Sequence, residues 1–224
     1  MTCTVAFSHL GLAYRDRILA QDIDMELPAG KLICLTGANG TGKSTLLRTI
    51  AGLQKPAFGD VRIGQQSVRQ ASKSGMARLV SVVLTGRIDV QGMTVEELIG
   101  LGRTPYTGFW GRLNEADKAI VERSMALTAT ANLRHRKVET LSDGEQQKVM
   151  TAKALAQETP VMLLDEPTAF LDYPSKQALM ELLRTLAHAE NKTIIMASHD
   201  LDLARRIADL TLVMAKGRLE IKAL

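Results

Sequence analysis

Short apolar runs recur along the chain and are separated by longer stretches of mixed polarity. Four of these runs have the length of a strand: Lys31–Thr36, Leu79–Leu84, Val161–Leu164 and Thr193–Ala197. None of the four alternates between apolar and polar positions, which is typical of strands buried on both faces. Because the stretches between them have helical character, the pattern predicts an α/β fold around a mainly parallel sheet.

The two ends of the chain carry a different pattern. The first 30 residues alternate loosely between apolar and polar positions and end in Leu-Pro-Ala-Gly, which predicts short antiparallel strands followed by a turn. The last apolar stretch, from Leu210 to Ile221, predicts a hairpin that turns at Lys216-Gly217.

Helices are predicted in the segments that separate the strands. Positions 93–135 are mostly helical in pattern, and a further helix begins at Ser142 and runs to about Gln157. Another helix starts near Pro174, because proline is favoured in the first turn. Its leucines recur on one face at helical spacing, at Leu179, Leu182, Leu183 and Leu186.

Length and composition fit one substantial soluble domain, which we place at residues 1–224. The net charge is +4, and the basic residues are scattered, so the charge pattern does not favour a nucleic-acid partner. No apolar run is long enough to span a bilayer, and the N-terminus shows no secretory leader. We therefore expect any membrane contact to be made through a partner.

A glycine-rich motif follows the first apolar run. Gly37-Ala-Asn-Gly-Thr-Gly-Lys-Ser-Thr45 matches the pattern G-x-x-x-x-G-K-[ST] between a predicted strand and a predicted helix that stops at Gly52. Backbone N–H groups in such a loop point at phosphate oxygens, the lysine neutralises the β- and γ-phosphates, and the following hydroxyl binds Mg²⁺. The nucleotide-contacting positions predicted here are Gly37, Asn39, Gly40, Thr41, Gly42, Lys43, Ser44 and Thr45.

Two carboxylates, Asp165 and Glu166, come at the end of the run Val161–Leu164. A carboxylate at a strand end beside a phosphate loop can hold Mg²⁺, and its neighbour can act as general base towards the attacking water. An acidic turn before a proline would explain the pair if it stood alone. Together with the upstream loop, the pair predicts ATP hydrolysis with Asp165 as metal ligand and Glu166 and Lys43 as catalytic residues.

Leu141–Gln147, with the sequence Leu-Ser-Asp-Gly-Glu-Gln-Gln, resembles the L-S-G-G-Q signature of ATP-binding cassette (ABC) proteins. Ser142 and Glu145 also fit a plain capping box, and the two interpretations are compatible. The resemblance implies a P-loop NTPase (RecA-like) core, an N-terminal antiparallel β-subdomain and a helical subdomain inserted at about 86–157. It also implies a dimer with a second copy or a homologous cassette, in which Ser142 and Gly144 contact the partner's ATP.

Three further positions match the family's elements. Tyr14 is similar to the aromatic residue that stacks on adenine, although a packed strand tyrosine explains it equally well. Asp172, at the end of Thr-Ala-Phe-Leu-Asp, resembles the loop that crosses the dimer interface. His199 follows a predicted strand and resembles the switch histidine that contacts the γ-phosphate, which adds it to the catalytic residues.

The chain departs from the family pattern at two places. Thr85 stands where the family usually has a glutamine that touches Mg²⁺, so Thr85 becomes a candidate metal ligand with a shorter reach. The signature carries Asp143 and Glu145 where glycine and glutamine are commoner, which adds negative charge near a phosphate site. Both departures would slow hydrolysis.

The segment Met93–Leu113 is similar to the import cassettes of iron–siderophore, haem and vitamin B12 transporters, in which a Gly-Arg-x-Pro motif precedes aromatic residues. The large apolar side chains either pack locally or form a docking patch, and they are Pro105, Tyr106, Phe109 and Trp110. The resemblance implies an ATPase subunit, with ATP and Mg²⁺ as cofactors, that powers such an importer. It would lie in the cytoplasm on the inner face of the membrane, bound to transmembrane permease subunits.

Two alternatives belong to other classes. A nucleotide-binding regulatory or assembly module with little turnover is motivated by Thr85 and the acidic signature. A DNA-maintenance ATPase would share the phosphate loop but needs a long coiled-coil insertion. The 122 residues from Lys43 to Asp165 (165 − 43) leave no room for that insertion.

Overall fold

The computed structural model describes residues 4–86, 90–108 and 110–222 of the chain. Its strands are β1 (Val5–Tyr14), β2 (Arg17–Leu27), β3 (Leu32–Thr36), β4 (Phe58–Ile63), β5 (Gln66–Ser67), β6 (Val80–Val83), β7 (Val161–Asp165), β8 (Thr193–Ala197), β9 (Leu210–Ala215) and β10 (Arg218–Lys222). Its helices are α1 (Lys43–Ile50), α2 (Lys73–Leu79), α3 (Val95–Gly100), α4 (Glu115–Leu127), α5 (Asp143–Ala156), α6 (Tyr173–Ala189) and α7 (Leu201–Ile207), with 3₁₀ turns η1 (Leu101–Arg103), η2 (Ala131–Leu133) and η3 (Val138–Thr140).

A six-stranded sheet with the order β10-β9-β3-β8-β7-β6 forms the centre of the fold. The five strands from β9 to β6 run parallel, and only β10 is antiparallel to its neighbour. The predicted parallel α/β core is therefore confirmed. In β3, which lies between β9 and β8, successive side chains enter different cores because strand side chains alternate between faces.

The two faces of this sheet bury different partners. Ile33 and Leu35 of β3 join a core with Leu46 and Ile50 of α1, while Cys34 joins a core beneath α6 and α7. Burial also raises the pKa of the Cys34 thiol to about 12, as expected for an inert packed cysteine. Both faces are covered by helices or by the second sheet, which explains the unbroken apolar pattern of these strands.

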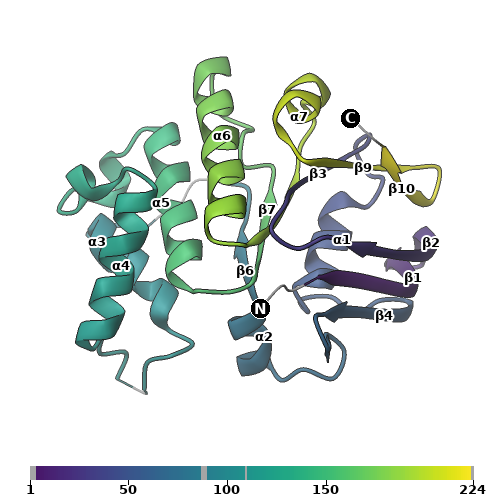
Figure 1. The fold of residues 1–224 in the computed structure, drawn as a ribbon, viewed down its shortest axis with the longest axis horizontal. Coiled ribbons are helices and arrows are strands. Elements are labelled where there is room, and N and C mark those ends of the chain that lie inside the picture. Colours follow the sequence, from purple (N-terminus) through teal and green to yellow (C-terminus); the bar gives the residue numbers. More distant parts are fainter. Residues whose placement is uncertain (1–3, 87–89, 109, 223–224) are drawn as a thin grey trace.

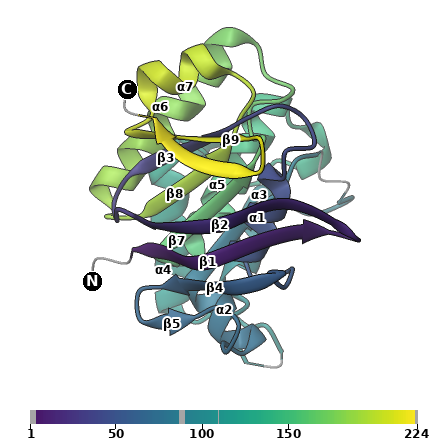
Figure 2. The ribbon, with the colours of Figure 1, turned by 90° about the vertical axis from the view of Figure 1, so that its right-hand side faces the viewer.

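The second sheet has the order β2-β1-β4-β5 and is antiparallel. Figure 2 shows it in front of the central sheet, with α1 behind it. Its first two strands are longer than the short strands we predicted, with 10 and 11 residues. The alternation is loose because the register shifts along β1, and His9 and Asp22 adopt positive φ values of 45° and 52°.

Helices α3, α4 and α5 gather at the other end of the molecule (Figure 1) and share a third core. Val95, Ile99, Val121 and Met125 are buried in it together with Val149 of α5. These helices fall between β6 and β7 in the sequence. The predicted helical character of positions 93–135 holds for α3 and α4, which are joined by the 3₁₀ turn η1 and a loop.

The predicted C-terminal elements are present. Helix α6 buries Leu179, Leu183 and Leu186, while Leu182 is partly buried. The final hairpin turns at Lys216 and Gly217, whose φ values are 49° and 75°. Among the described residues, every helix is too short or too polar to cross a bilayer.

Candidate functional site

The loop between β3 and α1 is shaped by glycines that no other residue could replace without strain. Gly37 has a φ of 151°, and an added Cβ would lie 2.4 Å from the carbonyl oxygen of Met214. Gly42 has a φ of 111°, and its Cβ would lie 3.2 Å from the Leu19 side chain. Gly40 has a φ of 75° and nothing within 4 Å of a Cβ, so its backbone is open to a ligand.

Helix α1 begins at this loop without a side-chain cap. Its N-cap is Gly42, no side chain accepts a hydrogen bond there, and the first turn contains no acidic residue. The first N–H groups of a helix have no partner within the helix, and the positive end of the helix dipole lies at the same place. The start of α1 is therefore an anion-binding site in both geometry and charge.

Lys43 is the first residue of α1 and is only 6% exposed. Its Nζ donates hydrogen bonds to the carbonyl oxygens of Gly37 at 2.8 Å and Ala38 at 3.1 Å. Burial lowers the pKa of this amine, and the nearby carboxylates of Glu166 and Asp165 oppose that shift. The loop thus holds a desolvated cation, which interacts more strongly with phosphate than an exposed lysine would.

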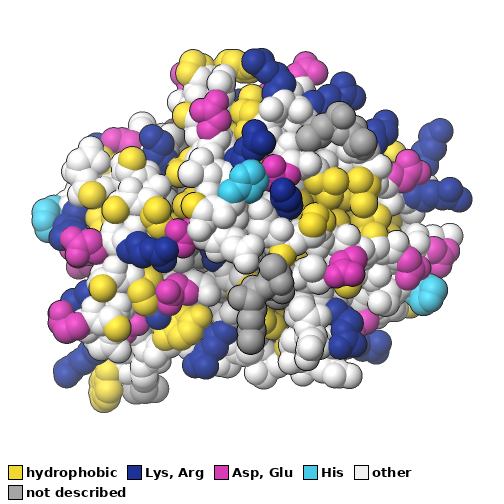
Figure 3. All heavy atoms as spheres, viewed as in Figure 1, with side chains coloured by type: hydrophobic (Ala, Val, Ile, Leu, Met, Phe, Trp, Pro, Cys, Tyr) yellow, Lys and Arg dark blue, Asp and Glu magenta, His cyan; other side chains and the backbone are white. Residues whose placement is uncertain are grey.

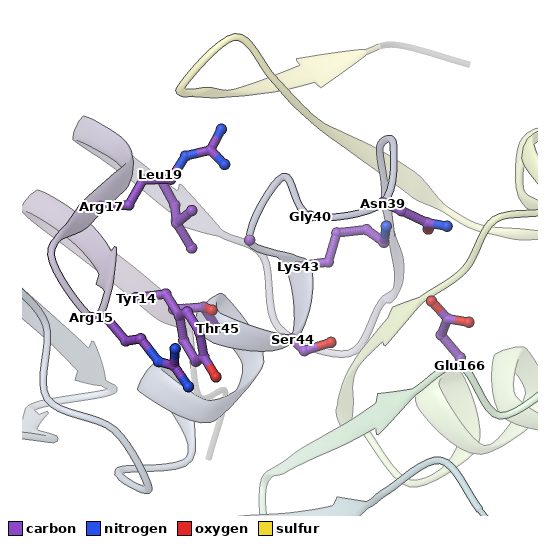
Figure 4. A pocket seen from close by; sticks show the side chains of 11 residues that line it. Tyr14, Arg15, Arg17, Leu19, Asn39, Gly40, Lys43, Ser44, Thr45 and Glu166 are labelled. Carbon is purple, nitrogen blue, oxygen red and sulfur yellow. The ribbon is translucent and has the colours of Figure 1, made fainter.

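A cavity of about 600 Å³ opens beside the loop. Figure 4 shows the tip of the β1–β2 hairpin on one side, the loop and α1 in the middle, and Glu166 on the other side. Its lining residues are Tyr14, Arg15, Arg17, Leu19, Asn39, Gly40, Gly42, Lys43, Ser44, Thr45 and Glu166. The cavity thus collects predicted site residues from three distant parts of the sequence. Tyr14 is 52% exposed there, which agrees better with a stacking surface than with a packed strand tyrosine.

Ser44 and Asp165 lie 121 residues apart in the sequence and meet at this site. The Ser44 hydroxyl donates to Oδ1 of Asp165 at 3.1 Å. Hydroxyl and carboxylate oxygens suit Mg²⁺, which is usually held by one or two protein oxygens together with waters and substrate phosphates. The described residues contain no group of three or more His, Cys, Asp or Glu that could hold a metal by itself. The residues present therefore fit a magnesium ion shared with a phosphate ligand.

Thr85, the other candidate metal ligand, has a different partner. Its hydroxyl donates to the backbone carbonyl oxygen of Asp165 at 2.5 Å, and its side chain is not among those that line the cavity. In this arrangement Thr85 fixes the end of β7 to the segment after β6. Thr85 therefore contacts the backbone of Asp165, next to the carboxylate site.

Oε1 of Glu166 and Nε2 of His199 are in direct contact. Glu166 follows β7 with a φ of 49°, and its backbone N–H donates to the carbonyl oxygen of Ala197 at the end of β8. The carboxyl ends of the two adjacent parallel strands thus bring together the Glu166 carboxylate, which lines the cavity, and the His199 imidazole, which does not line it. Figure 4 shows the carboxylate of Glu166 directed towards the cavity.

The other predicted nucleotide contacts form a separate group. Ser142 caps α5, Asp172 caps α6 through the backbone N–H of Ser175, and a Cβ on Gly144 would lie 3.8 Å from the Ser175 hydroxyl. The starts of α5 and α6 are therefore neighbours. Neither Ser142 nor Gly144 lines the cavity, and neither does Asp172. The structure divides the predicted site between two places on one chain.

The acidic signature is largely accounted for by local contacts. Oε2 of Glu145 accepts hydrogen bonds from the backbone N–H of Ser142 at 2.8 Å and from its hydroxyl at 2.9 Å. Oε1 of Glu145 pairs with Arg136 at 2.8 Å. The hydrogen bond from the Ser142 backbone is the main cause that lowers the pKa of Glu145, against the effect of burial. The charge of Glu145 is therefore paired within the cap.

Arg15, Arg17 and Leu19 also line the cavity, and they were not predicted from the sequence. Their position in the sequence could have identified them, because they come shortly after Tyr14, at a hairpin turn. The guanidinium carbon of Arg15 lies 5.7 Å from the centre of the Tyr14 ring, a distance at which a cation interacts with an aromatic face.

The aromatic loop after α3 contains one packed and one exposed aromatic side chain. Tyr106 packs locally: Arg103 lies 4.1 Å from its ring centre, and its hydroxyl donates to the carbonyl oxygen of Gln157 at 3.1 Å. Trp110 is 82% exposed, and Phe109 lies outside the described residues.

Basic and acidic side chains are interspersed over the face of the molecule shown in Figure 3.

A comparison with protein families matches residues 20–169 to the ABC transporter family. The iron(3+)-hydroxamate import ATP-binding protein FhuC of Bacillus subtilis is 34% identical, over 96% of this chain and 80% of that protein. The cobalamin import ATP-binding protein BtuD of Halobacterium salinarum is 41% identical, over 90% of this chain and 50% of that protein.

A solved structure extends the match to the fold. CbiO1 from Clostridium perfringens, part of the ABC transporter complex CbiONQ, superposes with a TM-score of 0.86 at 26% identity. The match covers 96% of this chain and 86% of that one. The predicted P-loop NTPase architecture is therefore confirmed. The chain belongs to the ABC transporter family, as an ATP-binding protein of the kind that hydrolyses ATP to drive transport.

Proposed function

We propose that this protein is the ATPase subunit of a membrane importer whose cargo is an iron–siderophore, haem or cobalamin-type metal chelate. The contact between Ser44 and Asp165, with Glu166 beside the same cavity, is the observation that supports the ATPase site best. The cargo class is supported by the similarity to the iron(3+)-hydroxamate import protein of B. subtilis and the cobalamin import protein of H. salinarum. The cargo itself has no site on this subunit in the proposal.

The residues of the cavity have distinct roles in the proposed hydrolysis. The backbone from Gly37 to Thr45 and the Lys43 amine bind the β- and γ-phosphates, and Tyr14 stacks on the base. Ser44 and Asp165 hold Mg²⁺, which neutralises phosphate charge when bound. Glu166 accepts the proton of the attacking water. His199 exchanges its Glu166 partner for the γ-phosphate, which frees the carboxylate to act as base.

Two chains are needed to complete the proposed site. Ser142, Gly144 and Asp172 do not line the cavity of their own chain. We assign them to the ATP bound by a second copy or a homologous cassette. A helix start that carries a hydroxyl is a suitable phosphate contact, and two such chains facing each other would each supply one.

The helical part of the chain is assigned to the membrane partner. We propose that residues 86–157 form an inserted subdomain, on the ground that α3, α4 and α5 share a core of their own. The exposed Trp110 in its loop suits contact with transmembrane permease subunits. The protein would then lie on the inner face of the membrane and touch it only through the permease.

Replacing Glu166 with glutamine tests the catalytic assignment. Glu166→Gln keeps the size of the side chain and removes the base, so we expect ATP binding to persist while hydrolysis falls by about 10²–10⁴-fold. Phosphate release in the presence of the permease and ATP binding by calorimetry measure the two effects. Glu220→Gln, in the exposed strand β10, is the matched control and should leave both unchanged.

The outcome also separates the importer from a regulatory module with little turnover. An importer subunit hydrolyses ATP when the permease is present, and that hydrolysis depends on Glu166. If the unmodified protein binds ATP but releases no phosphate with or without the permease, the importer proposal is wrong and the module is correct.

A further inference from the structure

The Glu145 carboxylate occupies the hydrogen-bonding groups at the start of α5. Its Oε2 accepts hydrogen bonds from the backbone N–H of Ser142 at 2.8 Å and from the Ser142 hydroxyl at 2.9 Å. A serine hydroxyl has one hydrogen to donate, and an ionised phosphate group is an acceptor. While Glu145 stays in this position, the Ser142 hydroxyl therefore has no hydrogen left for a phosphate.

The other oxygen of the same carboxylate is held by Arg136. Nη1 of Arg136 donates to Oε1 of Glu145 at 2.8 Å, and Nη2 donates to the carbonyl oxygen of Thr140 at 2.6 Å. The planar guanidinium thus contacts the chain on both sides of Ser142 in the sequence. It fixes the segment that enters the helix and the side chain that caps it.

The backbone of Arg136 is anchored without any help from Glu145. Its N–H donates to the carbonyl oxygen of Leu133 at 2.9 Å, and its carbonyl oxygen accepts from the N–H of Val95 at 3.0 Å. The next residue, Lys137, forms a β-bridge with Thr94. Arg136 therefore keeps its place when Oε2 of Glu145 leaves Ser142, and it remains a partner for the carboxylate.

A phosphate that approaches the start of α5 meets two obstacles, both due to Glu145. Ser142 is exposed and within reach of a second chain, but its hydroxyl must first be released. The carboxylate is also a negative charge, because the hydrogen bond from the Ser142 backbone keeps the pKa of Glu145 below its ordinary value. Like charges repel, and pairing one of them with a guanidinium reduces the repulsion.

We propose that Arg136 is a positioning residue for the pairing of two ATP-loaded chains. It holds Glu145 by Oε1 while Oε2 leaves Ser142, so that Ser142 can donate to the phosphate of the partner's ATP beside a carboxylate that stays paired. The inference rests on the proposed two-chain site. The side chains of Arg136 and Glu145 are 43% and 31% exposed, so water and salt screen their charges and the effect is moderate.

A double-mutant cycle on ATP-dependent dimerisation tests this role. Every chain carries Glu166→Gln so that ATP is not consumed, and sedimentation velocity in saturating MgATP gives the dissociation constant of the dimer. Arg136→Ala should weaken pairing by about threefold to tenfold. In a chain that also carries Glu145→Gln no carboxylate charge remains to be paired, so Arg136→Ala should change the constant by less than about twofold. Arg136→Lys should retain part of the pairing.

Arg134→Ala is the matched control, because Arg134 pairs with Glu122 at 3.3 Å and lies outside the contacts of Ser142. It should pair as tightly as the chain with Glu166→Gln alone. A thermal unfolding curve shows whether each variant is folded. Arg136→Gln, which has no charge but can still donate to Thr140, takes the place of Arg136→Ala in the cycle if that variant does not fold.

The outcomes separate the inference from the two-chain site on which it rests. If the chain with Glu166→Gln alone stays monomeric in saturating MgATP, the two-chain site is wrong and the role of Arg136 with it. If that chain dimerises and Arg136→Ala dimerises equally well, only the inference about Arg136 is wrong. An equal loss with and without Glu145→Gln also overturns it, since Arg136 would then act through Thr140 alone.

Discussion

Helices α1 and α5 both begin at a proposed phosphate contact, yet their N-termini are built in opposite ways. Helix α1 starts at Gly42, with no side-chain cap and no acidic residue in its first turn. Helix α5 starts at Ser142 with a complete capping box, and Asp143 and Glu145 lie in its first turn. One helix start is left without partners from its own chain, and the other is already satisfied.

The difference shows what each helix can do alone. The start of α1 needs an anion to satisfy its N–H groups and supplies Lys43 to neutralise it, so it can bind phosphate within one chain. At the start of α5, Ser142 and Glu145 already exchange hydrogen bonds. A phosphate there replaces existing hydrogen bonds, so α5 is suited to a contact made when a loaded partner arrives.

Removing the cation of α1 should give the largest effect. Lys43→Met leaves the phosphate loop without its buried positive charge, and we expect ATP affinity to fall by about tenfold to a hundredfold. Calorimetric titration of the isolated chain with MgATP measures the change. Lys55→Met, in the exposed segment after α1, is the control, and an equal loss in that variant would show that the effect is one of net charge.

Removing the cap of α5 should lower the free energy of unfolding and leave the isolated chain's ATP affinity unchanged. Ser142→Ala deletes the N-cap hydroxyl, which costs about 1 kcal/mol in the free energy of unfolding, measured by urea denaturation. The chain's own phosphate loop should still bind ATP, while hydrolysis by assembled cassettes should fall. A variant that loses ATP affinity as an isolated chain would contradict the division between the two helix starts.

The acidic residue of the same cap should give the smallest effect, visible in its pH dependence. Hydrogen bonds from Ser142 and the charge of Arg136 keep the pKa of Glu145 below its ordinary value of 4.5. A carboxylate with a lowered folded pKa stabilises the protein above its unfolded pKa, and the stabilisation is lost as pH falls through the folded pKa.

Glu145→Gln keeps the capping geometry and removes the charge. At pH 7 we expect its free energy of unfolding to be lower than that of the unmodified protein by a few tenths of a kcal/mol. The difference should disappear as the pH falls below 4.5. A difference that stays constant from pH 7 to pH 3 would show that the charge of Glu145 has no part in it.

Much of the fold could be predicted because buried parallel strands leave a strong local pattern. The runs that form β3, β7 and β8 are apolar on both faces, and α6 carries its stripe of leucines. Helices α2 and α7 were missed because both have only seven residues. In α2 only Met76 is buried, so no apolar stripe marks it. Helices this short depend on tertiary contacts that the local sequence does not encode.

The site could be predicted wherever chemistry and spacing coincide, as in the glycine loop and the pair Asp165 and Glu166. The partner of Thr85 could not, because the choice between a metal and the backbone of Asp165 depends on the distance between two strand ends. Arg15 and Arg17 were missed because an exposed arginine in a hairpin looks like an ordinary solvated side chain. Only the tertiary position of that hairpin beside the phosphate loop places them at the cavity.

The position of β3 has a consequence for how the protein is made. This strand carries the phosphate loop, and both of its neighbours in the sheet, β8 and β9, come from the last 32 residues of the chain. Gly37 is also packed against the carbonyl oxygen of Met214. During synthesis the loop therefore leaves the ribosome long before the strands that frame it. A nascent chain therefore lacks the complete frame of the phosphate loop until β9 has emerged.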